Sequence, residues 1–151
     1  MSEKFLVAVD GSDQAWKAVD LATNLAKAVD AELLILHVVP YEPMPDALLQ
    51  FAKIEGIPIE EERVRYHIGK AIGDKITGDV EAQVRKNGLT RVTTRVAEGN
   101  PADQIAALAR DLDLDMVFVG SHGLSDAKGL LLGSVSHKVM NLISCTCVAV
   151  K

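Results

Sequence analysis

GSHGLSDAKGLLLGSVS, residues 120–136, is a glycine-rich loop set between two regular elements. An apolar run at 116–119 precedes it, and a helical pattern follows it. Glycine lets backbone amides approach a ligand that a Cβ would hold away. The N–H groups of a helix start, together with the helix dipole, then complete an anion site. The stretch predicts a strand–loop–helix unit that binds the phosphate chain of a nucleotide.

The spacing of the small residues makes this prediction specific. Gly120 and Gly123 flank two residues, nine more residues follow, and Gly133 and Ser134 come next. Glycine is about 7% of an average chain, so this pattern arises by chance in under roughly 1% of chains of this length. The alternative is a surface loop whose glycines only make turns.

The composition favours one α/β domain and excludes several partners. The chain has 151 residues, 48% of them hydrophobic and only 4% aromatic, so its core consists of Val, Leu, Ile and Ala. Such a core is typical of a parallel sheet covered by helices. The net charge of −5 and the scarcity of aromatic residues give no basic footprint or stacking platform for nucleic acid. A polyanion would therefore be bound by local amides or a bound cation.

No targeting or membrane segment is expected. The apolar run at 5–9 is too short for the core of a signal peptide, and no apolar stretch approaches the length of a membrane span. The two cysteines, Cys145 and Cys147, lie two residues apart, so a disulfide framework is not indicated. We expect a cytoplasmic protein with no membrane partner.

Strands alternate with helices along the chain. Apolar runs predict strands at 5–9, 33–39, 91–97, 116–119 and 145–150, the third of them at a sheet edge. Helices are expected after an N-cap at Ser12, at 46–54, at 59–87, after an N-cap at Asn100, and at 133–142. The resulting order, βαβ(α)βαβαβ, predicts a doubly wound parallel sheet in a single domain.

Two helices have apolar stripes that should face the core. The predicted stripe of the first helix consists of Ala15, Val19, Ala22, Leu25, Ala26 and Val29. That of the long helix consists of Val64, Ile68, Ile72, Ile76, Val80 and Val84. Gly69, Gly73 and Gly78 weaken the long helix by up to about 1 kcal/mol each relative to alanine. In the helix after Asn100, we expect Ile105, Leu108 and Ala109 to face inward.

The turn after the first strand and the glycine loop should meet in space. In doubly wound sheets, ligands bind at the carboxyl ends of the strands, where the winding direction reverses. Asp10 is the only acid at a strand end beside this crevice, and its carboxylate could accept hydrogen bonds from ribose or base. Its alternative role is to cap the following helix. Lys128 is either a mobile charge for the ligand or a solvated side chain.

The other reactive residues have simpler interpretations. Gly133, Ser134, Val135 and Ser136 fit the outer phosphates, and the alternative is N-capping by Ser134 alone. His122 follows Ser121 directly, and adjacency alone does not make a nucleophile and base. We expect His37 beside the nucleotide pocket and His67 and His137 on helix surfaces. The two cysteines, on one face of the last strand, are interpreted as small buried hydrophobes, since further metal ligands at matching spacing are not evident.

Four stretches together resemble the universal stress protein family. They are VAVDGS at 7–12, HVV at 37–39, GNPA at 99–102, and the spacing Gly120-x2-Gly123-x9-Gly133-Ser134. The resemblance spans essentially the whole chain, and the glycine spacing is that of ATP-binding members. It implies a five-stranded fold of the adenine nucleotide α-hydrolase-like type with strand order 3-2-1-4-5. It also implies ATP, AMP or ADP with Mg²⁺, and a homodimer joined through residues 145–150.

The resemblance also assigns site residues. It places Ala8, Val9 and Asp10 at the adenosine, the Val38 backbone at adenine, Gly120 and Gly123 at ribose and first phosphate, and Gly133, Ser134, Val135 and Ser136 at the outer phosphates. The neighbouring residues Gly11, Ser12, Val119, Ser121 and His122 complete the predicted site. Some members carry proline where this chain has Ala8. The resemblance says little about residues 40–58.

Three functions remain open at this point. The first is a regulator in the stress response that binds ATP, whose shape or protein partner depends on the nucleotide, and that has no catalytic residue. It is favoured because no clear general base, Walker lysine or arginine finger is present. The second is slow ATP hydrolysis or self-phosphorylation on Ser121, Ser125 or Ser134. The third is a dimeric interaction module whose site holds no nucleotide.

Overall fold

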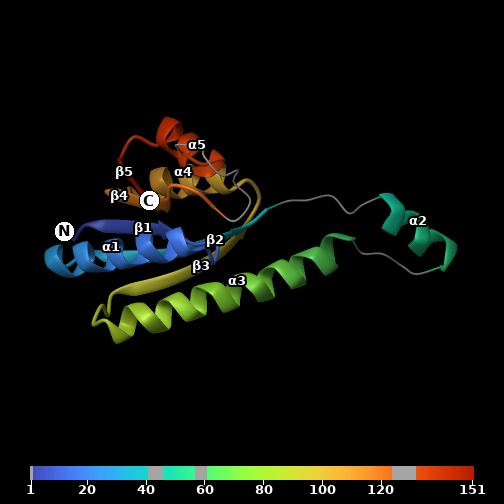
Figure 1. The fold of residues 1–151 in the computed structure, drawn as a ribbon, viewed down its shortest axis with the longest axis horizontal. Coiled ribbons are helices and arrows are strands. Elements are labelled where there is room, and N and C mark those ends of the chain that lie inside the picture. The colour runs from blue at the N-terminus through green and yellow to red at the C-terminus, as the bar shows by residue number, and fades with distance from the viewer. Residues whose placement is uncertain (1, 41–45, 57–60, 124–131) are drawn as a thin grey trace.

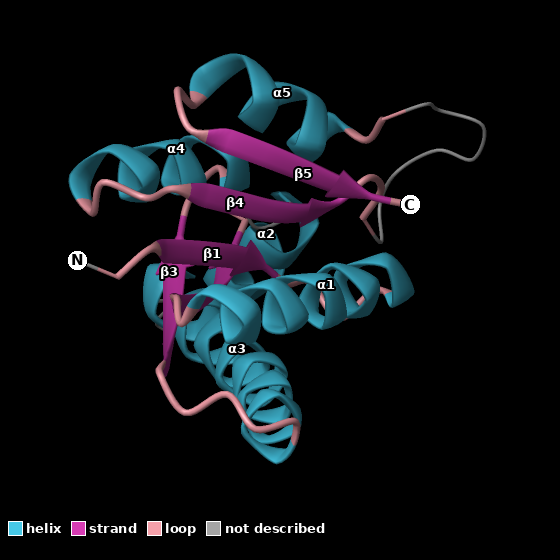
Figure 2. Ribbon diagram, turned by 90° about the vertical axis from the view of Figure 1, so that its left-hand side faces the viewer, coloured by secondary structure: helices cyan, strands magenta, loops and turns pink. Residues whose placement is uncertain are grey.

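The computed structural model describes residues 2–40, 46–56, 61–123 and 132–151, which form one parallel sheet with helices on both faces (Figures 1 and 2). Along the chain the elements are β1 (Lys4–Ala8), α1 (Asp13–Val29), β2 (Glu32–Val39), α2 (Asp46–Ile54), α3 (Glu61–Lys86), β3 (Val92–Glu98), α4 (Pro101–Asp111), β4 (Met116–Gly120), α5 (Ser134–Leu142) and β5 (Thr146–Val150). The strand order is β3-β2-β1-β4-β5. The predicted doubly wound sheet, its order and the edge position of β3 are confirmed.

Two hydrophobic cores lie on opposite faces of the sheet. Helices α1 and α3 cover one face, and α4 and α5 cover the other (Figure 1). The central strand β1 pairs with β2 and β4, and its Leu6 and Val7 are completely buried, one in each core. Continuous apolar runs are typical of parallel strands covered on both faces. Apart from the Phe5–Phe118 pair, the buried hydrophobic side chains of the described residues are aliphatic, as the composition predicts.

Both predicted N-caps are present and direct the chain away from the sheet. The Ser12 hydroxyl accepts a hydrogen bond from Ala15 N at 3.2 Å, and the Asn100 side chain accepts one from Asp103 N at 3.1 Å. These oxygens satisfy amides that have no partner within the helix. Pro101 occupies the first position of α4, where a missing N–H costs nothing. Helices α1 and α4 therefore begin at the carboxyl edge of the sheet.

Helix α1 lies close to the sheet because its buried stripe is made of small residues. Ala18, Ala22 and Ala26 are completely buried, whereas Leu25 and Val29 are partly exposed. The inward prediction for Leu25 and Val29 is therefore wrong. The side chains that contact the sheet share the face of Ala18, at steps of four residues.

Helix α3 is longer than the sheet it covers. Its 26 residues span about 39 Å, whereas the seven residues of β3 span about 23 Å. In its second half (residues 74–86), Val80 and Val84 are buried, as predicted. In its first half (residues 61–73), Ile68 is 58% exposed and Ile72 is 53% exposed, so their predicted core burial is wrong. The side chain of Val64 lies outside the described residues.

Gly69 and Gly73 bring α3 close to the sheet. A Cβ added to Gly73 would lie 2.7 Å from Val96 Cγ1 and 3.0 Å from His37 Cδ2, and one added to Gly69 would overlap Val39. Their absence of a side chain, which the sequence presents only as a weakness of the helix, permits this packing.

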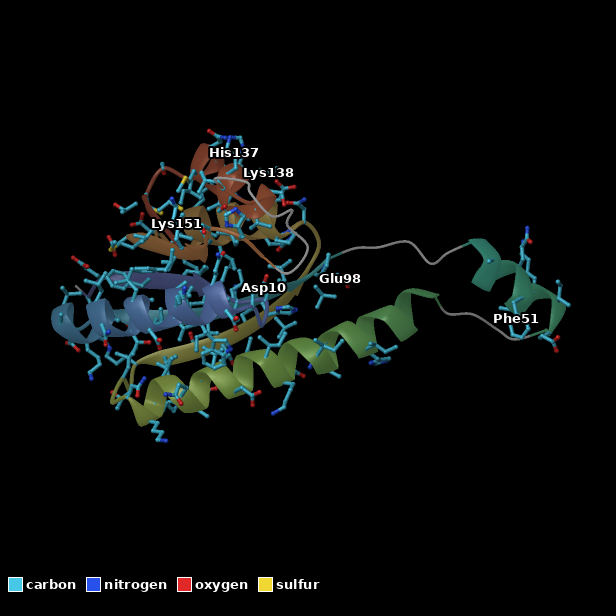
Figure 3. The ribbon with its side chains drawn as sticks, viewed as in Figure 1. Asp10, Phe51, Glu98, His137, Lys138 and Lys151 are labelled. Carbon is cyan, nitrogen blue, oxygen red and sulfur yellow. The ribbon has the colours of Figure 1, made fainter. Side chains whose placement is uncertain are left out.

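The short helix α2, predicted at 46–54, stands apart from the sheet beyond the start of α3, with Phe51 exposed (Figures 1 and 3). In the described residues, we find no helix with the length and apolarity of a membrane span.

Candidate functional site

A cavity of about 380 Å³ opens at the carboxyl ends of β1, β2 and β4. The turn after β1 lines one part of it, through Asp10 and Ser12. The glycine loop and the start of α5 line another part, so the predicted meeting of these two segments is confirmed. Figure 3 labels Asp10 near the middle of the view, close to the start of α1. Loop residues from distant parts of the chain thus share one concave site, as expected at the edge of a parallel sheet.

Most residues of the predicted site line this cavity. They are Ala8, Val9, Asp10, Ser12, Val38, Val119, Gly120, His122, Gly123, Ser134, Val135 and Ser136. The predicted residues Gly11, Ser121 and Gly133 are not among the lining residues. Ser121 is completely buried, and its groups hold the surrounding segments together. Lys128 and Ser125 lie outside the described residues.

The sequence does not assign the apolar part of the wall. Ile72 and Ile76 enter it from α3, and Pro101 and Ile105 enter it from α4. Ala15, Leu36 and Pro40 complete this wall. The available signal was positional: α4 follows β3, so its first turn has to lie at the same edge as the other strand ends. The position of Ile72 depends on how far α3 extends beyond the sheet, which apolar spacing does not tell.

Asp10 has a structural contact within the turn and also faces the cavity. Its Oδ1 accepts a hydrogen bond from Ser12 N at 2.9 Å, while Ser12 itself caps α1. The carboxylate therefore orients the cap residue, and the cap hydrogen bond belongs to Ser12. A carboxylate has two oxygens with several acceptor sites, so this contact is compatible with further hydrogen bonds to a ligand.

His37 is buried at the cavity wall, beside the site as predicted. Its Nδ1 lies 2.7 Å from the carbonyl oxygen of Val9, which can only accept, so Nδ1 carries the proton and donates. Val9 N in turn donates to the carbonyl oxygen of Leu36 at 2.8 Å. The ends of β1 and β2 are thereby fixed to each other where the cavity begins.

Gly120 is needed for packing against α1. A Cβ at this position would lie 3.2 Å from Ala15 N and from Gln14 C, both backbone atoms that cannot turn aside. The side chain of Gln14 contacts the next two residues: its Oε1 accepts from His122 N at 2.7 Å and from the Ser121 hydroxyl at 3.3 Å. The first turn of α1 therefore supports the residues that follow β4.

The start of α5 has a glycine as its N-cap residue. Its N-cap is Gly133, which has φ −74° and ψ 169°, so the alternative of capping by Ser134 is wrong. Ser134 is the first helical residue and lines the cavity, as do Val135 and Ser136. A helix N-terminus that presents amides and the positive end of its dipole to a cavity favours an anionic group there.

Ser121 connects the loop to two other elements. Its N–H donates to the carbonyl oxygen of Val150 in β5 at 2.7 Å. Its carbonyl oxygen accepts from Gly133 N at 2.5 Å and from the Ser136 hydroxyl at 2.9 Å. The start of α5 is thus held against the end of β4 by direct hydrogen bonds.

The Ser121–His122 pair is in contact but is poorly placed for covalent chemistry. Ser121 Oγ lies 3.2 Å from His122 Nδ1, a distance typical of a nucleophile and its base. However, Ser121 is completely buried, and its hydroxyl also contacts Gln14. A nucleophile has to reach its substrate, so this pair supports a structural role.

Two further features of the described residues concern metal ligands and thiols. No group of three or more His, Cys, Asp or Glu side chains there is placed to hold a metal ion. Cys145 and Cys147 are free and only partly buried, so the prediction that they are buried is wrong; their partial burial raises the pKa of both thiols. Raised pKa values disfavour the reactive thiolate, which agrees with a packing role. His67 and His137 are exposed on helices, as predicted.

A family profile described as the universal stress protein family matches residues 1–151 of the chain. The chain belongs to this family. The universal stress protein YxiE of Bacillus subtilis is 37% identical to it, with 100% of both chains covered. Each of the stretches that carry the family resemblance contributes residues to the cavity wall.

Solved structures share the fold. The universal stress protein UspA from Lactobacillus plantarum superposes with a TM-score of 0.79 at 22% identity, covering 99% of this chain and 97% of that one. A universal stress protein solved in complex with cAMP has a TM-score of 0.66 and 28% identity, with coverage of 99% and 96%. The bound cAMP is a property of that relative.

Proposed function

We propose that the protein is an adenine-nucleotide-binding regulator of the stress response and that its ligand is ATP. One observation carries the proposal: the start of α5 and the apolar walls from β2 and α3 line the same cavity. Phosphates would lie at Gly123 and the start of α5, ribose at Asp10, and the base between β2 and α3. The relative that binds cAMP supports the adenine nucleotide.

The residues present fit a triphosphate that carries its own magnesium. Mg²⁺ in nucleotide sites is bound by one or two carboxylates together with phosphate oxygens and water. Asp10 is a carboxylate of the cavity wall that we place at the ribose, so the triphosphate oxygens and water would supply the magnesium ligands. AMP and ADP fill the same base and ribose positions with fewer contacts at α5. ATP affinity should therefore exceed AMP affinity.

Gly133→Val tests the site. Gly133 is the N-cap of α5 and has an ordinary φ of −74° that valine can adopt, so its branched side chain would crowd the helix start where we place the phosphates. ATP binding by calorimetry should be lost, and circular dichroism checks that the variant is folded. Gly78→Val is the matched control, because nothing lies within 4 Å of a Cβ at Gly78. Unchanged ATP affinity in Gly133→Val would count against the proposed site.

The enzymatic alternative needs an accessible serine, and one of the described candidate serines is accessible. Of the serines proposed as phosphate acceptors, Ser121 is buried, whereas Ser134 is exposed and lines the cavity. Incubation with γ-labelled ATP separates the possibilities: a regulator leaves the label on the nucleotide, and self-phosphorylation transfers it to protein. Loss of that label in Ser134→Ala would identify the acceptor. An interaction module without a ligand would show no nucleotide by mass spectrometry after gentle purification.

We also propose a homodimer through β5. This strand forms one edge of the sheet. The carbonyl oxygen of Val150 accepts from Ser121 N, and Thr146 N donates to the carbonyl oxygen of Asp115. The alternate residues Cys147 and Ala149 therefore direct their backbone groups outward. An unpaired edge is a liability unless it is covered, and a second copy would pair with it antiparallel. Ala149→Pro removes an outward amide and should give monomers in sedimentation, whereas Ala149→Val should remain dimeric. We also propose that the protein is located in the cytoplasm.

A further inference from the structure

Gln14 has an unusual position for a residue in the first turn of a helix. Its side chain leaves α1 and reaches the loop after β4, more than a hundred residues away in sequence. Its Oε1 accepts from the backbone N–H of His122 at 2.7 Å. Because a backbone N–H can only donate, the oxygen of the amide has to face His122. The same oxygen accepts from the Ser121 hydroxyl at 3.3 Å.

This contact also orients the imidazole of His122. When the Ser121 hydroxyl donates its only proton to Gln14, its oxygen can only accept from His122 Nδ1, which lies 3.2 Å away. One side chain thereby fixes both the backbone and the ring of His122. His122 lines the cavity, whereas Gln14 is not among the lining residues. Gln14 therefore acts on a ligand through His122.

The loop held in this way belongs to the phosphate end of the site. His122 lies between Gly120 and Gly123 in the glycine spacing, and Ser121 is bonded to Gly133 and Ser136 at the start of α5. The base end is built separately, by β2, α3 and α4. A change at Gln14 should thus affect the phosphates of a nucleotide and leave its nucleoside part in place.

We propose that Gln14 is a positioning residue that aligns the Ser121–His122 segment for recognition of nucleotide phosphates. This inference rests on the proposed adenine-nucleotide function. Phosphate binding by preformed donors depends on their orientation before the ligand arrives. Gln14 supplies that orientation from a neighbouring helix.

The test compares ATP with adenosine by calorimetry in Gln14→Met, which keeps the size of the side chain and removes its oxygen. ATP affinity should fall about tenfold, because the acceptor for both donors is lost, and adenosine affinity should change less than about twofold. Gln83→Met, on the exposed face of α3, is the matched control and should change neither. Equal losses for ATP and adenosine, or no loss for ATP, would overturn the assignment.

A second measurement needs no ATP binding. The His122 amide of the nucleotide-free wild-type protein should be protected from hydrogen exchange, and its resonance should move in Gln14→Met but stay near the wild-type position in Gln14→Glu, which keeps an acceptor oxygen. Rapid exchange of this amide in the wild-type protein would overturn the inference even if Gln14→Met does not fold. If wild-type protein binds no adenine nucleotide while this amide is protected, the proposed function fails and the Gln14 contact stands.

Discussion

The two halves of α3 have the same apolar spacing and different surroundings. In the second half, Val80 and Val84 pack into the core beneath α1 and the sheet. In the first half, Ile68 and Ile72 follow the same face of the helix and are more than half exposed. Periodicity tells which side chains share a helix face. Whether anything covers that face depends on where the neighbouring strands end.

Alanine substitutions in the two halves give the largest expected difference. Val84→Ala should lower the free energy of unfolding by about 2 kcal/mol, because it removes two buried methyl groups and leaves a cavity. Ile68→Ala should lower it by less than about 0.5 kcal/mol, since an exposed side chain loses little. Urea denaturation measures both. A loss for Ile68→Ala as large as that for Val84→Ala would mean that another surface covers the first half of α3.

Glycine substitutions test how closely α3 approaches the sheet. Gly73→Ala should destabilise the protein by about 1–2 kcal/mol, because the new Cβ overlaps Val96 and the His37 ring. Gly78→Ala, where nothing lies within 4 Å of a Cβ, should stabilise it by up to about 1 kcal/mol through helix propensity. Thermal melts of both variants suffice. Stabilisation by both would show that α3 can move away from β2 and β3 at little cost.

The strands and the caps followed from local signals in the sequence, whereas the strand order was implied by the family resemblance. Continuous apolar runs, Ser12, and Asn100 with Pro101 act within a few residues of themselves, and the structure confirms the elements that they predict. The edge position of β3 followed from its polar alternation. Such signals need no knowledge of distant residues.

The remaining features depend on contacts between distant segments. Leu25 and Val29 fit the apolar spacing of α1, but the small residues Ala18 and Thr23 took the buried positions. Gly73 appears in the sequence only as a weak point in a helix, since its partners lie in β2 and β3. In the site, the glycine loop and Asp10 were identified by type and spacing. The contact between Gln14 and His122 was not, because no local pattern connects α1 with the loop after β4.

The first half of α3 also supplies part of the cavity wall, which provides a third test. Ile72 is 53% exposed and lines the cavity, so a bound base would cover its apolar surface. Ile72→Ala should weaken ATP binding about fivefold by calorimetry while leaving the free energy of unfolding nearly unchanged. Ile68→Ala is the control, since Ile68 is not a lining residue. Equal affinities in both variants would remove α3 from the site.

Ion pairs in the two halves give the smallest expected effect. Lys70 Nζ lies 3.1 Å from Asp74 Oδ2, and both side chains are at least half exposed. Lys70→Ala should therefore cost less than about 0.5 kcal/mol, and that cost should vanish in high salt. Arg85→Ala should cost more in any salt, because the guanidinium also donates to the carbonyl oxygens of Thr90 and Val92 and so fixes the end of α3 to the start of β3. A salt-independent loss for Lys70→Ala would indicate that the first half of α3 is held as firmly as the second, which contradicts the exposure of Ile68 and Ile72.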